Sequence, residues 1–284
     1  MIPSAFGYHR ATSVDDALGA ISAAGGGAKI IAGGQSLLPL MKLRLASAET
    51  LVDIGRLDEL KGLRPLPDGG LEIGALTTYA EVLDSTALQI AVEAISDIGD
   101  VQVRNRGTVG GAVAHADPAS DLPALGLALD YSVVLRSSRG ERVVPLDGFF
   151  EGAFETGIAA DELVVALRRG PLPGGIGGSY QKLTQPASGY SIVGVAAVVA
   201  KSGGSVGHVR VAITGVGEVA YRAKAVEAAL AGTDGSAAAI AAAAAHATDG
   251  VTVNSDIHAD SAYRTAMAEV YTRRALEAAL GRSA

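Results

Sequence analysis

Two pairs of adjacent glycines, Gly33-Gly34 and Gly110-Gly111, constrain this 284-residue chain more than any other feature. They lie in the segments Ala32-Gly33-Gly34-Gln35-Ser36 and Thr108-Val109-Gly110-Gly111, and helix-compatible sequence follows each. Adjacent glycines let the backbone turn N–H groups toward one point and let a bulky anion come close. Together, the two loops favour a large ligand whose central diphosphate is gripped from both sides.

Each loop also has a plainer explanation, because two glycines at the end of a strand can form a simple turn. For the first loop alone, both interpretations stay open. The second loop has Arg104, Asn105 and Arg106 before it and these residues after it: His115, Asp117, Pro118, Ser120 and Asp121. Asp117-Pro118 can start a helix and Asp121 can be a solvated helix residue. Near a diphosphate, the same side chains suit recognition of ribityl, ribose or adenine groups.

Composition excludes several classes of function. The formal charge of −7 argues against a nucleic-acid partner, since binding to phosphate backbones needs a basic surface. The chain has no cysteine, so it offers no disulfide, no thiolate nucleophile and no thiolate ligand for an iron–sulfur cluster. The five histidines have no H-x₃-H spacing, and we expect no metal site in this chain. No signal peptide is visible and apolar runs such as 192–200 are too short to span a bilayer, which predicts a cytoplasmic protein without a transmembrane segment.

Hydrophobic periodicity predicts the helices and strands, and a Pro/Gly-rich stretch predicts one boundary between them. The first 55 residues alternate between helix at 12–24 and from 37, and strands at 29–32 and 51–54, which indicates a small α/β unit with a parallel sheet. After this unit we predict a strand at 71–74, helices from 79 and at 88–100, a hairpin within 131–145 and a strand at 162–167. A Pro/Gly-rich boundary at 170–175 precedes strands at 179–184, 191–200 and 206–214, and then helices at 221–231, 236–247 and 260–281.

A second glycine motif offers an alternative function. The segment Gly215-Val216-Gly217-Glu218-Val219-Ala220 matches the dinucleotide fingerprint G-x-G-x-x-A, as in a stand-alone NAD-dependent oxidoreductase. We predict a turn there instead, because only a short glycine turn separates the preceding strand from 191–200. A dinucleotide-binding unit needs a helical crossover between parallel strands.

The polar segment 180–190 lies between two apolar strands and contains two ambiguous residues. Lys182 can be a solvated strand residue or can meet an anionic ligand, and Tyr190 can be ordinary core or can lie against a planar ring. Spacing alone does not decide between these interpretations.

Three segments resemble a known family. They are AGGQSLLPLMKLRLA at 32–46, QVRNRGTVGGAVAHADPASDLPA at 102–124 and YQKLTQPASGYSIVGVAAVV at 180–199. They are similar to the FAD-binding medium subunit of molybdenum hydroxylases, the family of aerobic carbon monoxide dehydrogenase and xanthine dehydrogenase. The resemblance covers nearly the whole chain and includes both glycine motifs in order. Two departures are Gln35, where many relatives have histidine, and 186–190, where carbon monoxide dehydrogenases have a K-T-G-D-W-type segment.

The resemblance implies an α+β fold with a vanillyl-alcohol-oxidase (PCMH)-type FAD-binding domain in two α/β subdomains, at 1–55 and 56–172. A C-terminal domain at 173–284, a three-stranded antiparallel sheet with helices, is implied to follow. The implied FAD-binding residues are Ala32, Gly33, Gly34, Gln35, Ser36, Leu37, Thr108, Val109, Gly110, Gly111, Ala112, Asp121, Lys182 and Tyr190. Of these, Lys182 and Tyr190 are implied to lie near the isoalloxazine. No catalytic acid or base is implied, because an electron-transfer subunit positions its flavin and tunes it.

The family also implies partners. A large subunit would carry a molybdenum cofactor, a small subunit two [2Fe-2S] clusters, and the whole would be a dimer of heterotrimers. Electrons would pass from the clusters through FAD to quinone or another acceptor, with possible peripheral attachment of the complex to the inner face of the membrane. The substrate is oxidised on another subunit, so carbon monoxide, xanthine, aldehydes and N-heterocycles all stay open. A subunit without cofactor that only docks partners is a further alternative.

Overall fold

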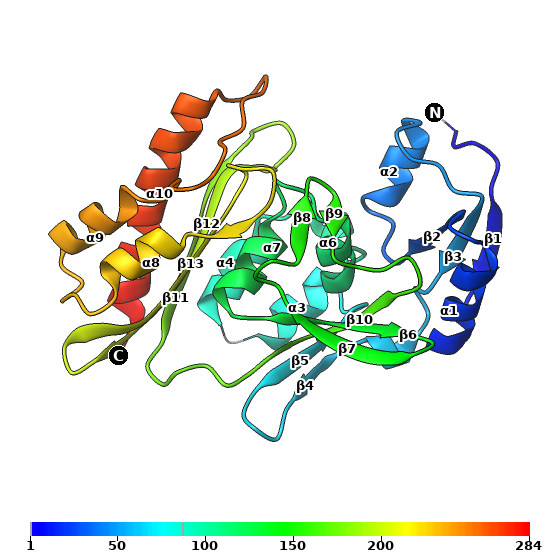
Figure 1. The fold of residues 1–284 in the computed structure, drawn as a ribbon, viewed down its shortest axis with the longest axis horizontal. Helices are drawn as coiled ribbons and strands as arrows, with labels where there is room; N and C mark the ends of the chain where they lie inside the picture. Colours follow the sequence, from blue (N-terminus) through cyan, green and yellow to red (C-terminus); the bar gives the residue numbers. More distant parts are fainter. Residues whose placement is uncertain (1, 87) are drawn as a thin grey trace.

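The computed structural model describes residues 2–86 and 88–284, which form three units that follow one another along the chain (Figure 1). Each unit is built on its own β-sheet. The first unit, blue in Figure 1, and the third unit, yellow to red, lie at opposite ends of the view with the second between them. Among these residues, no helix is both long enough and apolar enough to cross a membrane.

The first unit is a three-stranded parallel sheet in the order β1-β3-β2, as predicted for this segment. Its edge strand β1 has no sequence signal, because its residues are mostly exposed. Ser13 caps helix α1 by accepting a hydrogen bond from the N–H of Asp16, and α1 buries one apolar face. The elements are β1 Gly7–Arg10, α1 Val14–Ala23, β2 Ala28–Ile31, α2 Leu37–Lys42, β3 Thr50–Asp53 and the 3₁₀ turn η1 Asp58–Leu60.

The second unit is an antiparallel five-stranded sheet in the order β4-β5-β10-β6-β7, with helices packed against it. Helix α3 begins with a capping box formed by Thr78 and Glu81, in agreement with the helix predicted from residue 79. The helix predicted at 88–100 ends at Ser96, because the backbone turns at Gly99 with a φ of 54° before a new helix starts. The elements are β4 Leu63–Pro65, β5 Leu71–Gly74, α3 Tyr79–Ser85, α4 Gln89–Ser96, α5 Val101–Arg104, α6 Val109–His115, α7 Asp121–Ala128, β6 Ser132–Ser137, β7 Gly140–Pro145, β8 Phe150–Gly152, β9 Glu155–Thr156 and β10 Leu163–Arg169.

The third unit is an antiparallel sheet in the order β11-β12-β13-β14, covered by the long helix α10. We predicted three strands; the sheet has these three and a fourth, β14, of two residues at its edge. The sequence signal for β14 is too short to separate it from the helix that follows. The elements are β11 Gly177–Thr184, β12 Ser191–Ser202, β13 Ser205–Thr214, β14 Tyr221–Arg222, α8 Lys224–Leu230, α9 Ala237–Ala244 and α10 Ser261–Arg282.

The fingerprint at 215–220 follows β13, which pairs antiparallel with both of its neighbours. The prediction of a turn rather than a dinucleotide-binding unit is therefore confirmed. Gly215 has a φ of 81°, and a Cβ on it would lie 2.6 Å from the carbonyl oxygen of Ser191. A glycine at this position lets the turn after β13 approach the start of β12 closely.

Candidate cofactor site

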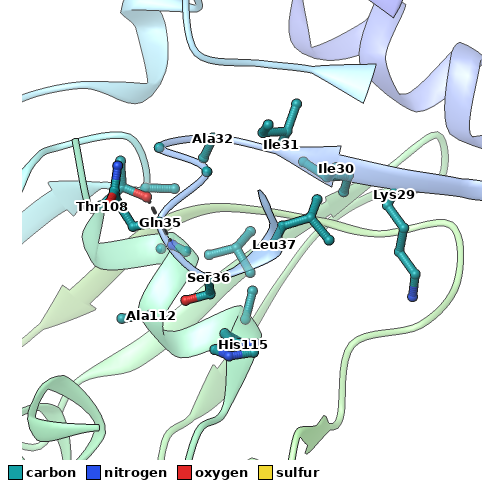
Figure 2. A pocket seen from close by; sticks show the side chains of 18 of the residues that line it. Lys29, Ile30, Ile31, Ala32, Gln35, Ser36, Leu37, Thr108, Ala112 and His115 are labelled. Carbon is teal, nitrogen blue, oxygen red and sulfur yellow. Dashed lines mark hydrogen bonds between the residues drawn. The ribbon is translucent and has the colours of Figure 1, made fainter. Parts of the chain in front are cut away.

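A cavity of about 750 Å³ lies between the first and second units and is the place where the two predicted glycine loops meet. Figure 2 shows Gln35 and Ser36 from one loop around the same hollow as Thr108 and Ala112 from the other. The predicted residues that line it are Ala32, Gly33, Gly34, Gln35, Ser36, Leu37, Thr108, Gly110, Gly111 and Ala112. Val109 is buried beneath them and does not line the cavity.

The first loop offers unused hydrogen-bond donors to this cavity. In the part of the chain that the structure describes, no protein acceptor receives the N–H groups of residues 33 to 37. The side chain of Ser36, at the start of α2, caps no N–H group there either. Consecutive N–H groups without acceptors form a concave site that attracts an anion. The first loop therefore leaves five N–H groups available to an anionic ligand.

The second loop differs, because its N–H groups already have acceptors within the protein. Val109 donates to the carbonyl oxygen of Thr77 and Gly110 to that of Ala75. Gly111 donates to the hydroxyl of Thr108, and Ala112 donates to the carbonyl oxygen of Thr108. We expected both loops to turn N–H groups toward one ligand; in this loop the N–H groups already have partners, because Thr108 caps α6 and α6 packs against the end of β5.

Gly33 and Gly110 are needed for contacts inside the protein. A Cβ on Gly33 would lie 1.8 Å from the carbonyl oxygen of Arg106, and a Cβ on Gly110 would lie 2.5 Å from the Cβ of Ala75. Gly34 has a φ of 73°, which favours glycine. We expected these glycines to leave room for the ligand; within the protein, Gly33 lets the two loops touch and Gly110 lets α6 pack against Ala75 at the end of β5.

Asp121 and Lys182 form a buried ion pair away from the cavity lining. Lys182 Nζ lies 2.8 Å from Asp121 Oδ2, and the two side chains are 4% and 6% exposed. The hydroxyls of Tyr180 and Ser191 both donate to Asp121 Oδ1, at 2.5 and 2.6 Å. Burial raises the pKa of Asp121, and the Lys182 ammonium and the hydroxyl donors oppose that rise. The pair connects α7 of the second unit to β11 of the third.

Tyr190 lies outside the large cavity as well. It is half-exposed and lines a smaller cavity of about 300 Å³, together with Asp117, Ile192 and Arg264. The structure therefore brings ten of the fourteen predicted residues to one cavity and leaves Val109, Asp121, Lys182 and Tyr190 outside its lining.

The cavity also has lining residues that we did not predict as ligand-binding residues. Most are apolar, and they come from separate strands, helices and loops, so no single sequence motif marks them. Glu162 is one of the charged residues in the lining. Arg142 Nε donates to Glu162 Oε1 at 2.6 Å, and this hydrogen bond holds the pKa of Glu162 below its ordinary value. The further lining residues include Lys29, Ile30, Ile31, Ile54, Tyr79, His115, Phe154, Ile158, Glu162, Leu163 and Val164. Among residues 2–86 and 88–284, no three His, Asp or Glu side chains gather in a way that could hold a metal ion.

Two family models together match most of the chain. Residues 4–168 match the FAD binding domain in molybdopterin dehydrogenase, and residues 178–279 match the CO dehydrogenase flavoprotein C-terminal domain. The junction between the two models falls where the second sheet ends and the third begins.

Full-length relatives agree with the models. The chain is 40% identical to the carbon monoxide dehydrogenase medium chain of Hydrogenophaga pseudoflava, over all of both chains. It is 37% identical to the 6-hydroxypseudooxynicotine dehydrogenase complex subunit alpha of Paenarthrobacter nicotinovorans, over 100% of this chain and 97% of the relative. The solved carbon monoxide dehydrogenase of H. pseudoflava superposes with a TM-score of 0.96 at 42% identity, covering both chains completely. The chain belongs to the family of FAD-binding subunits of molybdopterin dehydrogenases.

Proposed function

We propose that this chain binds one FAD with its diphosphate on residues 33–37 and carries electrons within a molybdenum-containing hydroxylase complex. The observation that carries the proposal is the row of five N–H groups without protein acceptors at the edge of a 750 Å³ cavity. A diphosphate needs such donors, and a cavity of this size suits a cofactor. The residues present therefore fit the cofactor that the family binds.

The second loop has a supporting part in this proposal. The backbone of Arg106 and Gly107, just before the second loop, lies against Gly33 of the first loop, whereas the N–H groups of Val109 and Gly110 already have acceptors within the second unit. The hydroxyl of Ser36 has no capping bond in α2 and can donate to a phosphate oxygen. We propose that Ala32 to Leu37 and Thr108 to Ala112 form the diphosphate region, with unequal roles for the two segments.

For the flavin end of the cofactor, we propose Asp121, Lys182 and Tyr190. When bound, FAD accepts electrons and passes them on. The buried Lys182 ammonium would place a positive charge near the ring, and Asp121 would hold that ammonium in position. Tyr190, half-exposed beside the smaller cavity, would cover the ring from the side of the solvent. The domain limits that go with this arrangement are 1–55, 56–172 and 173–284.

Partners supply the remaining cofactors in this proposal. The chain has no cysteine for iron–sulfur ligands, so electrons reach its FAD from [2Fe-2S] clusters in a small subunit. A large subunit carries the molybdenum cofactor and oxidises the substrate. We propose a dimer of heterotrimers with quinone or a similar acceptor, inside the cytoplasm. Relatives named for carbon monoxide, 6-hydroxypseudooxynicotine and nicotine oxidation match this chain at 33–40% identity, so carbon monoxide is one candidate among several substrates.

The purified chain should be yellow, alone and together with its partners. We expect absorption bands near roughly 370 and 450 nm and release of about one FAD per chain on denaturation, as a flavin site of this kind requires. The measurement is a visible spectrum with the extracted cofactor identified by chromatography. A colourless protein in both preparations would contradict the proposal and favour a subunit that only docks partners. Colour in the complex alone would keep the proposal and assign part of the site to partner contacts.

Replacing Tyr190 by alanine should alter the flavin spectrum or its reduction potential, because an aromatic ring beside the isoalloxazine changes its surroundings. The matched control is Tyr263→Ala, since Tyr263 is exposed to a similar extent, 46% against 47%, and lies on α10. If both variants keep the spectrum and potential of the unmodified chain, Tyr190 has no contact with the flavin.

A further inference from the structure

Two residues in unfavourable backbone conformations are joined at one end of the large cavity. Phe154, in the turn between β8 and β9, has a φ of 61°, and Ala116, at the end of α6, has a φ of 51°. The N–H of Phe154 donates to the carbonyl oxygen of Ala116 at 3.1 Å. Residues with a Cβ populate this left-handed region sparsely, and such residues cluster at ligand-binding and active sites.

The strained turn brings two aromatic rings together at the cavity. The centroids of His115 and Phe154 lie 5.1 Å apart with the planes tilted by 43°, and both residues line the cavity. Burial lowers the pKa of His115, which keeps its imidazole neutral near pH 7. Phe154 is nevertheless 56% exposed, although it is fully apolar. One end of the cavity therefore has an uncharged aromatic wall with a free ring face.

The composition of the cavity indicates which half of FAD this wall meets. Every lining residue belongs to the first 164 residues of the chain. Lys182 and Tyr190, which we propose for the flavin end, are outside it. The lining of the cavity is largely apolar and includes Ile30, Ile158 and Val164, which suits the faces of a purine.

We propose that Phe154, supported by His115, covers the adenine ring of FAD, and that the strained backbone at Phe154 is retained because it holds the ring over the cavity. The inference rests on the proposed FAD site. A purine stacked on Phe154 would cover the apolar ring face that is open in the chain alone, and stacking of a base on an aromatic side chain strengthens binding substantially.

The test compares FAD with ADP, which has the adenine and the diphosphate but lacks the flavin. Both are titrated into the full-length chain after its flavin is removed. We expect Phe154→Ala to weaken FAD and ADP binding alike, by roughly 5- to 100-fold, and Phe154→Tyr to keep most of the affinity. Phe6→Ala is the control, because Phe6 is exposed and does not line the cavity. It should change neither affinity.

The outcomes separate this inference from the proposed function. Weaker FAD binding with unchanged ADP binding would overturn it, since Phe154 would then meet the flavin half. Unchanged binding of both ligands would also overturn it, as would an unmodified chain that binds FAD but shows no ADP binding. An unmodified chain that binds no FAD would contradict the proposed function itself.

The strain has its own readout. Phe154→Gly and Phe154→Ala both lack the ring, but glycine adopts a φ of 61° without steric cost. We expect the flavin-free Phe154→Gly chain to melt about 2–4 °C above the flavin-free Phe154→Ala chain, while both lose the same affinity for ADP. Equal melting temperatures would contradict a retained strain.

Discussion

Replacing Gly33 by alanine should disrupt the packing between the first two units and abolish FAD binding at the same time. The new Cβ would lie 1.8 Å from the carbonyl oxygen of Arg106, a backbone atom that a side-chain rotation cannot move. We expect the free energy of unfolding of the flavin-free chain to fall by at least about 3 kcal/mol, near the upper end for overpacking. Urea denaturation measures this loss, and the absorption of the purified protein measures its flavin content.

The stability of the flavin-free chain distinguishes two roles for this glycine. If Gly33 only leaves room for the diphosphate, Gly33→Ala would lose FAD without any change in that stability, and the contact with Arg106 would then be unimportant. The control is Gly19→Ala, in helix α1, where a Cβ meets nothing within 4 Å. Alanine is the better helix former, so this control should gain up to about 1 kcal/mol.

The case of Gly33 illustrates what the sequence could predict and what it could not. Local patterns predicted the helices at 12–24 and from 79, and the structure shows why: Ser13 caps α1 and Thr78 forms a capping box with Glu81, and both caps depend only on residues three positions apart. The two glycine loops were predicted to meet, and they do. A further reason for the glycine at position 33 could not be predicted, because the contact between Gly33 and Arg106 joins residues far apart in the chain and has no local signature.

The same limit applies to the rest of the site. Phe154 lines the cavity from a short hairpin turn, and nothing in its neighbours marks a residue with a positive φ. The resemblance pointed to Asp121 and Lys182 separately, but their ion pair and its two hydroxyl donors follow from the register of β11 and β12. Gly194, opposite Lys182 in that register, leaves room for the Tyr180 hydroxyl, since a Cβ there would lie 2.2 Å from it.

Breaking the Asp121–Lys182 pair should destabilise the chain strongly. Asp121→Asn leaves the Lys182 ammonium without a carboxylate, and Lys182→Met leaves the Asp121 carboxylate with only hydroxyl donors, in a place where both side chains are at most 6% exposed. Each single change should lower the free energy of unfolding by about 3–5 kcal/mol, because an uncompensated buried charge remains. Urea denaturation of the flavin-free chain measures each loss.

The double variant decides whether the pair acts as a unit. With both charges removed, no unpaired charge is left, so we expect the loss to be smaller than the sum of the single losses by about 1–3 kcal/mol. Lys224→Met is the control, because Lys224 and its partner Asp147 are 68% and 43% exposed, and such surface pairs contribute at most about 1 kcal/mol. Strictly additive losses would mean that the two residues act independently. In that case Asp121 would not be what holds Lys182 in position, and the flavin end would need a different anchor for its positive charge.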